Sequence, residues 1–278
     1  MSYKEIADEH TKKINDLIDG LFERVRSVQS EFYDNLYDDI VNNLTENGKI
    51  KRGNVGSLSA FPAYRKASGR LLNWIIEAIN ELSESIAKYF GFVTKRNVSE
   101  DVRKATETLL NQLGYNGKKF SETGVLYSLV SDNSVERRVK VAAIQAINTG
   151  KSLKDFRGQL QAMILGDRAT GKLGIVEAHY HTNARTLFSE FDRSISYNIA
   201  AKYDLDYVVW SGPRLTSSRS FCASKKGKVF PVSEIKGFDK KDWQGKIPGQ
   251  STIISAGGYN CTDNLLYISK EMAEEMIV

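Results

Sequence analysis

The chain is poor in the residues on which disulfide frameworks and membrane anchors depend. Its 278 residues include two Cys and four Pro. Two cysteines do not make a disulfide framework, although Cys222 and Cys261 could bond to each other, and in a reducing compartment two thiols are the default. No apolar run approaches the roughly 18 residues that a membrane span needs, and residues 1–5 lead into no apolar signal region. We expect a soluble protein that is made in a cytoplasm.

Histidine is equally scarce, which limits the metal sites and catalytic bases that the chain can build. On a helix, His179 and His181 point in different directions and cannot hold one ion together, and His10 lies far away in the sequence. Cys222 and Cys261 have no C-x-x-C or H-x-x-C neighbour, and no His follows residue 181 to act as a base for a nucleophilic thiol. We therefore expect no metal site, no cofactor and no catalytic residue.

One segment resembles a nucleotide-binding motif without completing it. Residues 166–172 read GDRATGK and match the first seven positions of a P-loop, but Leu173 stands where the Mg²⁺-binding Ser or Thr is required. A P-loop also follows a buried strand, whereas residues 160–165 end a predicted helix. The segment is better interpreted as a basic loop between two helices.

Charge is distributed unevenly along the chain. Residues 1–50 carry 6 Lys or Arg against 11 Asp or Glu, and residues 51–172 carry 20 against 11. The remaining residues are nearly balanced, at 13 against 12. A basic middle suits contact with nucleic acid or an acidic protein surface. Ordinary solvated helix faces explain the same composition.

The first two hundred or so residues have the periodicity of helices. Helices are predicted at 14–44, at 72–89 with a stop at Gly91, at 97–113, from about 133 to 150, at 152–165 and at 175–203. A loop is predicted at 53–62, and Asn47 and Gly48 should stop the first helix. The first two helices are long enough to form an antiparallel hairpin. The first also has a heptad seam from Ile14 to Phe32, which favours packing on a second helix of the same chain and, as the alternative, self-association.

The pattern changes after residue 206. Short strands are predicted at 207–210, 228–232, 252–254 and 265–268, separated by Gly and Pro turns, with a terminal helix from 270. We expect an α+β protein with a helical body at 1–173 and a smaller module at 174–278 that consists of a long entry helix and a β-rich part. Lysines alternate with aromatic residues in this module, so Lys225, Lys226 and Lys228 are candidate DNA contacts, against the alternative of general surface charge.

The glycine, tryptophan and cysteine positions of the module form a recognisable set. The set comprises Ser-Gly-Pro at 211–213, Arg219 before Phe221 and Cys222, Gly-Lys-Val-Phe at 227–230, Trp-Gln-Gly at 243–245 and Gly-Gly-Tyr-Asn-Cys at 257–261. Together these residues resemble the C-terminal domain of phage Mu F-like head morphogenesis proteins, the minor capsid proteins of tailed phages. The resemblance covers about residues 180–268, with Arg185 and Asp192 on the entry helix.

The chain departs from the family pattern at polar positions. Leu215 and Ser218 replace the Asp and Thr of the family, and Thr262 with Asp263 replaces Arg-His. The fold-determining residues remain, which favours a structural role for the module. Its expected scaffold and docking residues are Gly212, Pro213, Arg219, Cys222, Gly227, Trp243, Gly245, Gly257, Gly258, Tyr259 and Cys261.

The resemblance implies a non-enzymatic virion protein. Members of the family are present in few copies inside the head, associate with the portal and assist assembly, DNA packaging or DNA exit. The implied partners are the portal protein, the major capsid protein and packaged DNA, without a membrane, and the implied location is the capsid interior near the portal vertex. Two alternatives stay open at this point. One is a nuclease or toxin-like enzyme using His179, His181, Arg185 or Arg219, and the other is a DNA-binding accessory protein without portal contact.

Overall fold

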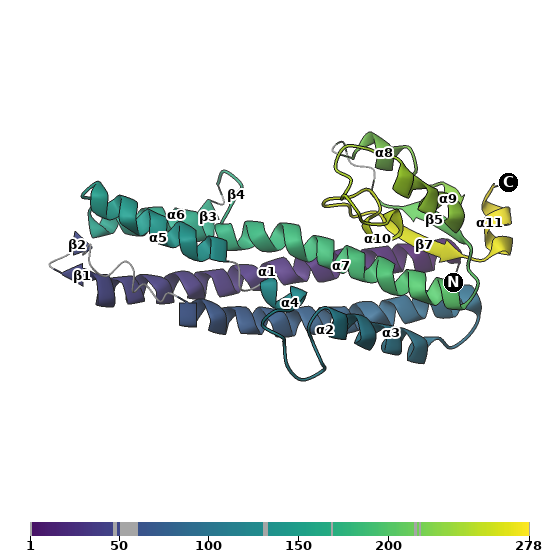
Figure 1. The fold of residues 1–278 in the computed structure, drawn as a ribbon, viewed down its shortest axis with the longest axis horizontal. Coiled ribbons are helices and arrows are strands. Elements are labelled where there is room, and N and C mark those ends of the chain that lie inside the picture. The colour runs from purple at the N-terminus through teal and green to yellow at the C-terminus, as the bar shows by residue number, and fades with distance from the viewer. Residues whose placement is uncertain are drawn as a thin grey trace. The chain divides into compact units, whose positions relative to one another are not determined.

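The computed structural model describes residues 2–46, 49–50, 61–129, 133–167, 169–213, 216 and 218–277. The protein is α+β, as the sequence predicts: long helices are followed by a small three-stranded sheet (Figure 1). The loop expected at 53–62 is wrong at its last two residues, because α2 (Phe61–Thr94) begins at the first of them. Residues 53–60 of this loop, the helix stop at Asn47 and Gly48, and Leu215 lie outside the described residues. No helix among the described residues is both long enough and apolar enough to cross a bilayer.

The chain forms two compact units, and each unit is assembled from distant segments. Unit 1 contains residues 1–18, 77–119 and 184–278, and unit 2 contains residues 19–76 and 120–183. Three long helices contribute residues to both units: α1 (Tyr3–Leu44), α2 (Phe61–Thr94) and α7 (Ile175–Lys202). The division at residues 173 and 174 that the sequence suggests stays a prediction.

Within each unit α1 and α2 pack as antiparallel neighbours, which confirms the predicted hairpin. In unit 1, Lys13 Nζ lies 2.6 Å from Glu81 Oε2. In unit 2, the Arg24 guanidinium lies 5.2 Å from the ring centre of Trp74. The heptad positions Ile14 to Phe32 are buried inside the chain. A partner could therefore reach this seam only if the helices separated.

Most predicted helices are present with nearly the expected bounds. They are α3 (Ser99–Gln112), α5 (Asn133–Asn148), α6 (Leu153–Leu165), α7 and α11 (Lys270–Ile277). Ser152 is the N-cap of α6, since its hydroxyl accepts a hydrogen bond from Asp155 N at 3.1 Å. The predicted stop at Gly91 is wrong: α2 continues to Thr94 and ends where Lys95 adopts a φ of +55°.

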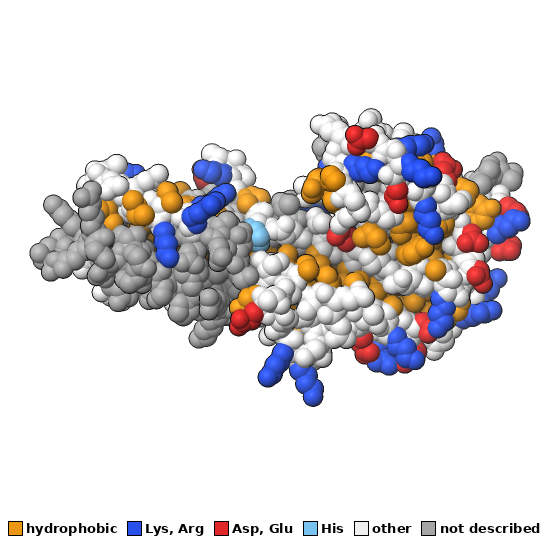
Figure 2. Space-filling view, in the orientation of Figure 1, with side chains coloured by type: hydrophobic (Ala, Val, Ile, Leu, Met, Phe, Trp, Pro, Cys, Tyr) orange, Lys and Arg blue, Asp and Glu red, His pale blue; other side chains and the backbone are white. Residues whose placement is uncertain are grey.

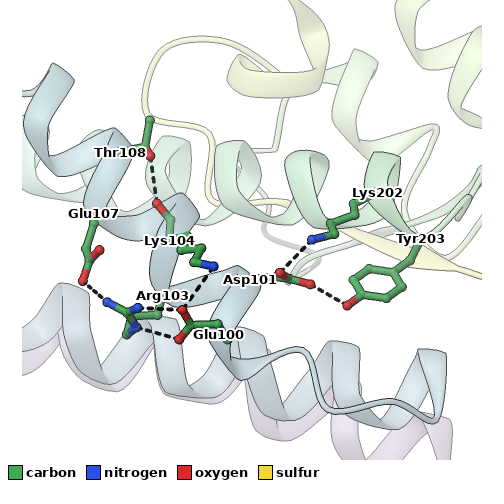
Figure 3. A network of polar contacts seen from close by, with 8 residues as sticks. All are labelled: Glu100, Asp101, Arg103, Lys104, Glu107, Thr108, Lys202 and Tyr203. Carbon is green, nitrogen blue, oxygen red and sulfur yellow. Dashed lines mark hydrogen bonds and ion pairs between the residues drawn. The ribbon is translucent and has the colours of Figure 1, made fainter.

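Helix α3 is fixed to α7 within unit 1 by a polar network (Figure 3). Asp101 accepts hydrogen bonds from Lys202 Nζ at 2.7 Å and from Tyr203 Oη at 2.6 Å. These two donors lower the pKa of Asp101. On the exposed side of α3, hydrogen bonds from Arg103 and Lys104 lower the pKa of Glu100 to about 2. The network adds a polar contact to the apolar packing of Val102 and Leu110.

The module's sheet has the strand order β6-β5-β7 and is antiparallel throughout. Strands β5 (Tyr207–Ser211) and β7 (Asn264–Ile268) confirm two predictions, and all five residues of β7 are buried. Strand β6 (Val229–Pro231) is shorter than predicted, because α9 (Val232–Gly237) begins directly after Pro231. In unit 1, Tyr89 Oη of α2 donates to Tyr267 O of β7 at 2.9 Å, which attaches the sheet to the helices.

The predicted strand at 252–254 is wrong. These residues form a short helix, α10 (Thr252–Ser255). The carboxylate of Asp239 accepts hydrogen bonds from Thr252 N and, at 2.9 Å, from Ser251 Oγ. This contact satisfies the N-terminal donors of a helix turn, and it overrides the strand preference of Thr and Ile.

The remaining short elements are in unit 2 or next to the sheet. The segment that resembles a P-loop forms a two-stranded hairpin, β3 (Gly166–Asp167) with β4 (Lys172–Leu173). It follows α6 rather than a strand, in agreement with its interpretation as a loop between helices. A second hairpin pairs β1 (Thr45–Glu46) with β2 (Lys49–Ile50), and α4 (Val125–Ser128) and α8 (Ser220–Ala223) are single turns of helix.

Candidate functional site

Arg219 fixes the loop at 257–261 of the C-terminal module through two of the loop's carbonyl groups. Its Nη2 donates to Tyr259 O at 2.5 Å and its Nη1 donates to Gly257 O at 3.4 Å. The same Gly257 carbonyl accepts from Trp243 Nε1 at 3.0 Å, and Tyr259 N donates to Gly245 O at 2.9 Å. The loops at 243–249 and 257–261, which we call the clamp loops, are therefore joined by side-chain and main-chain hydrogen bonds.

The glycines of the clamp loops are required by close contacts. A Cβ on Gly245 would lie 2.4 Å from Arg219 Nε, and a Cβ on Gly258 would lie 1.9 Å from Gly245 O. Both residues also have positive φ values, +87° and +94°. A side chain at either position would clash and strain the backbone. These positions support the scaffold role that the sequence assigns to them.

Cys222 and Cys261 lie next to each other where the clamp loop at 257–261 ends. Both are buried, unbonded thiols. Gly257 N donates to Cys261 Sγ at 3.2 Å, and a Cβ on Gly257 would lie 2.1 Å from Cys222 Sγ and 3.0 Å from Cys261 Sγ. Both sulfurs and a carboxylate oxygen of Asp263 lie within 4.8 Å of one another. Packing of the two thiols in a small core agrees with one of the two interpretations that the sequence allows.

Asp263 is a buried carboxylate with both oxygens paired. Trp210 Nε1 donates to Oδ2 at 2.9 Å, and Lys226 Nζ lies 3.1 Å from Oδ1. Lys226 also donates to Pro213 O and, at 3.0 Å, to Ser218 Oγ. A Cβ on Gly212 would lie 2.2 Å from Oδ1, so this carboxylate also explains the glycine at 212. Three donor groups of a metal site are therefore close together, but an ammonium group already pairs with one of them.

This geometry corrects one expectation about DNA contacts. The side chain of Lys226 is 5% exposed and is used inside the module, so it is not placed to contact a phosphate. Lys225 lies partly buried with its Nζ 3.5 Å from the ring centre of Phe221, and burial lowers its pKa. Lys228 is exposed. A DNA contact by Lys225 or Lys228 stays a prediction.

The aromatic rings of the module face one another and the lysines. Phe221 and Trp243 stack in parallel with ring centres 3.8 Å apart. Lys225 covers Phe221, and Lys246 Nζ lies 4.9 Å from the ring centre of Trp243. Because the faces of Phe221 and Trp243 are already covered by each other and by lysines, these rings cannot stack on nucleic-acid bases unless the loops rearrange. On the face seen in Figure 2, acidic and basic side chains are intermingled over the module.

Tyr259 differs from its neighbours because its ring faces solvent. Its main chain is fixed on both sides, by Gly245 O and by Arg219, while 54% of the residue is exposed. A rigid backbone that presents an exposed aromatic ring is a typical anchor of protein interfaces.

Gly227, another of the expected scaffold residues, has a φ of +79° and forms the turn in which its N–H donates to Trp210 O at 2.8 Å.

Arg193 is a member of this site that the sequence does not predict. It is 1% exposed, and its guanidinium donates to Ile254 O, to Asp263 O at 2.8 Å and to Cys261 O at 3.5 Å. It thereby attaches α7 to the loops that surround the cysteines. Its only sequence signal is an arginine on the apolar face of the entry helix.

A second constellation that the sequence does not predict lies among three helices of unit 1. His10 Nε2 lies 3.0 Å from Asp192 Oδ1, and His10 Nδ1 lies 2.8 Å from Ser85 Oγ. The three residues are connected as in a Ser-His-Asp triad, but the two imidazole nitrogens are exchanged, with Ser85 on Nδ1 and Asp192 on Nε2. Ser85, however, lies inside α2, where intrahelical bonds use the backbone N–H groups that an oxyanion hole would need. The trio is best understood as a buried polar link between helices.

Two of the residues proposed for an enzyme, His179 and Arg219, have structural partners. His179 Nε2 lies 2.9 Å from Leu129 O in unit 2. Arg219 donates to Gly257 O of a clamp loop, and the side chain of His181 is outside the described residues. Arg185 lies in unit 1 on α7.

A cavity of about 610 Å³ lies beside the β3–β4 hairpin, within unit 2. Its lining includes the carboxylates Glu23, Asp167 and Glu177 against the cations Arg26 and Lys172. Arg26 is already paired with Glu177 at 2.7 Å. The excess of carboxylates disfavours a phosphate here, in agreement with the incomplete P-loop motif.

Comparisons with known proteins do not extend these observations. A scan against protein-family models finds no match, and searches of curated proteins and of solved structures find none either.

Proposed function

We propose that the chain is a structural minor head protein of a tailed phage. It binds the portal or the inner capsid and assists head assembly, DNA packaging or DNA exit. The observation that carries the proposal is the convergence of the residues behind the family resemblance. Gly245, Gly257, Tyr259 and Arg219 lie in one hydrogen-bonded unit, and Cys222 and Cys261 pack side by side against Gly257.

The convergence supports docking over catalysis. The residues that carry the resemblance pack or form hydrogen bonds within the module. Arg219 donates to two carbonyls of the clamp loop at 257–261, and Gly257 makes room for two sulfurs. The residue that these contacts leave projecting is Tyr259. We assign its ring to the centre of the contact with the portal or capsid protein.

A binding experiment tests the proposal. The full chain is titrated against the portal protein and the major capsid protein encoded in the same genome, by biolayer interferometry. Tyr259→Ala is compared with Met276→Ala, which removes another exposed apolar side chain of the module. Loss of an interface anchor weakens binding by about 30-fold or more. We expect this loss for Tyr259→Ala alone. Absence of binding to both head proteins, with the wild-type chain folded, would contradict the proposal.

A DNA-binding accessory protein is the second candidate, supported by the basic composition of residues 51–172 and by the exposed Lys228. Binding to phosphates releases counterions, so affinity falls steeply with salt. DNA titrations at two salt concentrations separate the candidates. A steep salt slope without binding to head proteins favours the accessory role.

A further inference from the structure

The two cysteines of the chain lie 39 positions apart in sequence and side by side in the fold. They are the only cysteines, and they are 4% and 6% exposed. Cys222 is on the α8 turn, and Cys261 ends the clamp loop at 257–261. Gly257 packs against both sulfurs, and a Cβ at this position would overlap Cys222 Sγ.

We propose that Cys222 and Cys261 are a redox-active dithiol that closes to an intramolecular disulfide when a peroxide oxidises it. Cys261 is the thiol that reacts first, and Cys222 is the resolving thiol. The disulfide joins α8 to the clamp loop and fixes the segment that presents Tyr259.

The contacts around the two sulfurs favour Cys261 over Cys222 as the thiol that reacts first with peroxide. Gly257 N donates to Cys261 Sγ, and the guanidinium of Arg193 is anchored on Cys261 O and Asp263 O. A hydrogen bond from Cys222 lowers the pKa of Cys261, and Arg193 adds to the effect. The same hydrogen bond raises the pKa of Cys222, together with burial. Burial opposes this lowering at Cys261, but of the two sulfurs Cys261 is the one whose contacts favour the nucleophilic thiolate.

The reaction balances with one peroxide molecule. The Cys261 thiolate attacks one oxygen of hydrogen peroxide, the O–O bond breaks, and sulfenic acid forms at Cys261 with release of hydroxide. Cys222 sulfur then attacks the sulfenic sulfur, the S–O bond breaks, and the disulfide forms with release of water. The Cys222 proton leaves with that water, and the hydroxide takes up the proton lost from Cys261. Reduction by an external dithiol restores both thiols.

A metal ion is a weaker occupant of this site. Zinc prefers four ligands, and the described residues here supply Cys222, Cys261 and Asp263. Asp263 has both oxygens paired, with Lys226 on Oδ1 and Trp210 on Oδ2. Binding a dication would place it beside the Lys226 ammonium or require that group to leave a buried position. Disulfide formation requires neither.

The experiment uses the full chain, fully reduced and then desalted. Hydrogen peroxide is added, samples are quenched with an alkylating reagent, and intact mass and peptide mapping follow the two cysteines. We expect the loss of two hydrogen atoms per chain, a Cys222–Cys261 cross-linked peptide and no covalent dimer. Closure of a loop of this length should raise the melting temperature by roughly 5–10 °C. Because both thiols are buried, oxidised glutathione should react much more slowly than peroxide.

Single variants test the order of the two thiols. In Cys222→Ser, peroxide should leave a sulfenic acid at Cys261 that dimedone traps. In Cys261→Ser the effect of Cys261 on Cys222 is removed, but burial and the neighbouring Asp263 still raise the pKa of Cys222, so its labelling should be at least about tenfold slower. Equal labelling of the two variants would overturn the assignment of Cys261 as the first thiol.

Wild-type protein alone can overturn the proposal, even if the variants do not fold. Two free thiols that persist in excess peroxide would do so, as would disulfides formed only between chains. Stoichiometric zinc in the purified protein, with thiols released only by a chelator, would also overturn it. Portal binding is read out separately, so failure of this proposal and failure of the proposed function are distinguishable.

Discussion

Trp210 donates its indole N–H to the carboxylate of Asp263 at 2.9 Å, across the pairing of β5 with β7. Lys226 pairs with the other oxygen of the same carboxylate. All three side chains are buried. Asp263 therefore links the sheet, the turn after α8 and the cysteine pair. One of the positions at which the chain departs from the pattern that it resembles is thus a structural centre of the module.

Replacement of Asp263 by Ala should destabilise unit 1 strongly. The change leaves the Lys226 ammonium and the Trp210 N–H buried without their acceptor. Loss of one partner of a buried ion pair costs about 3–5 kcal/mol. Urea unfolding followed by tryptophan fluorescence gives the change in free energy. Glu234→Ala, an exposed carboxylate of the same module, is the matched control and should change stability by less than about 0.5 kcal/mol. Equal effects of the two variants would contradict the assigned role.

Alanine at Gly245 or Gly258 should disrupt the clamp loops. A Cβ on Gly258 would lie 1.9 Å from Gly245 O, and a Cβ on Gly245 would lie 2.4 Å from Arg219 Nε. We expect a loss of more than about 2 kcal/mol for each variant, from strain and overpacking together. Gly237→Ala is the control, because a Cβ there meets nothing within 4 Å and φ is −62°. Thermal melts that place all three variants at the wild-type temperature would show that the clamp is not required for folding.

Removal of the Asp192 carboxylate should weaken the helical part of unit 1. Asp192→Ala leaves His10 without its buried partner at Nε2 and also removes buried side-chain volume. The expected loss is about 2–4 kcal/mol. The surface pair Lys13–Glu81 lies in the same unit, on α1 and α2, and Lys13→Ala should cost less than about 1 kcal/mol. Urea midpoints of the two variants provide the comparison, and a loss for Asp192→Ala no larger than that for Lys13→Ala would argue against the buried link.

Stability should fall at alkaline pH because of two buried tyrosines. Burial raises the pKa of Tyr89 and of Tyr267 above the ordinary value of 10.0. Above that value the unfolded chain loses phenolic protons that the folded chain keeps, so the free energy of unfolding decreases as pH rises. Each group contributes a slope of roughly 1 kcal/mol per pH unit.

Urea midpoints from about pH 8 to about pH 11 measure this slope. Tyr89→Phe removes one of the two groups and should make the slope shallower, in addition to losing the hydrogen bond to Tyr267 O. Phenolate absorbance of the folded protein provides an independent check. If all 13 tyrosines titrate near the ordinary value while the protein stays folded, the two rings are not buried as described.

The sequence predicts the parts of the fold that depend on local periodicity. Apolar positions at helical spacing locate α5, α6 and α7, and the β-branched and aromatic residues at 207–210 locate β5. The strand predicted at 252–254 fails because the Asp239 carboxylate, which lies more than ten residues away, caps a helix turn there. The helix stop predicted at Gly91 is also wrong, since α2 continues through this residue to Thr94.

The candidate site is predictable only in part, because several of its contacts join segments that are far apart in the sequence. The Gly, Trp and Cys positions are evident from their spacing, and the clamp loops contain most of them. The pairing of Lys226 with Asp263, the position of Arg193 and the His10–Asp192 link arise from contacts between segments far apart in sequence. A lysine among other lysines carries no local sign that its ammonium is buried, so the sequence alone does not distinguish Lys226 from its exposed neighbours.

Quantitative mass spectrometry of purified virions provides the decisive test of the proposed function. Particles produced from the genome that encodes this chain are purified, and the chain is quantified relative to the portal and major capsid proteins. We expect the chain in the particles at a few copies per portal, with Tyr259→Ala reducing its incorporation and Met276→Ala leaving it unchanged. Particles that assemble and package DNA without containing the chain, while the folded protein is present in the lysate, would contradict a role as a head protein.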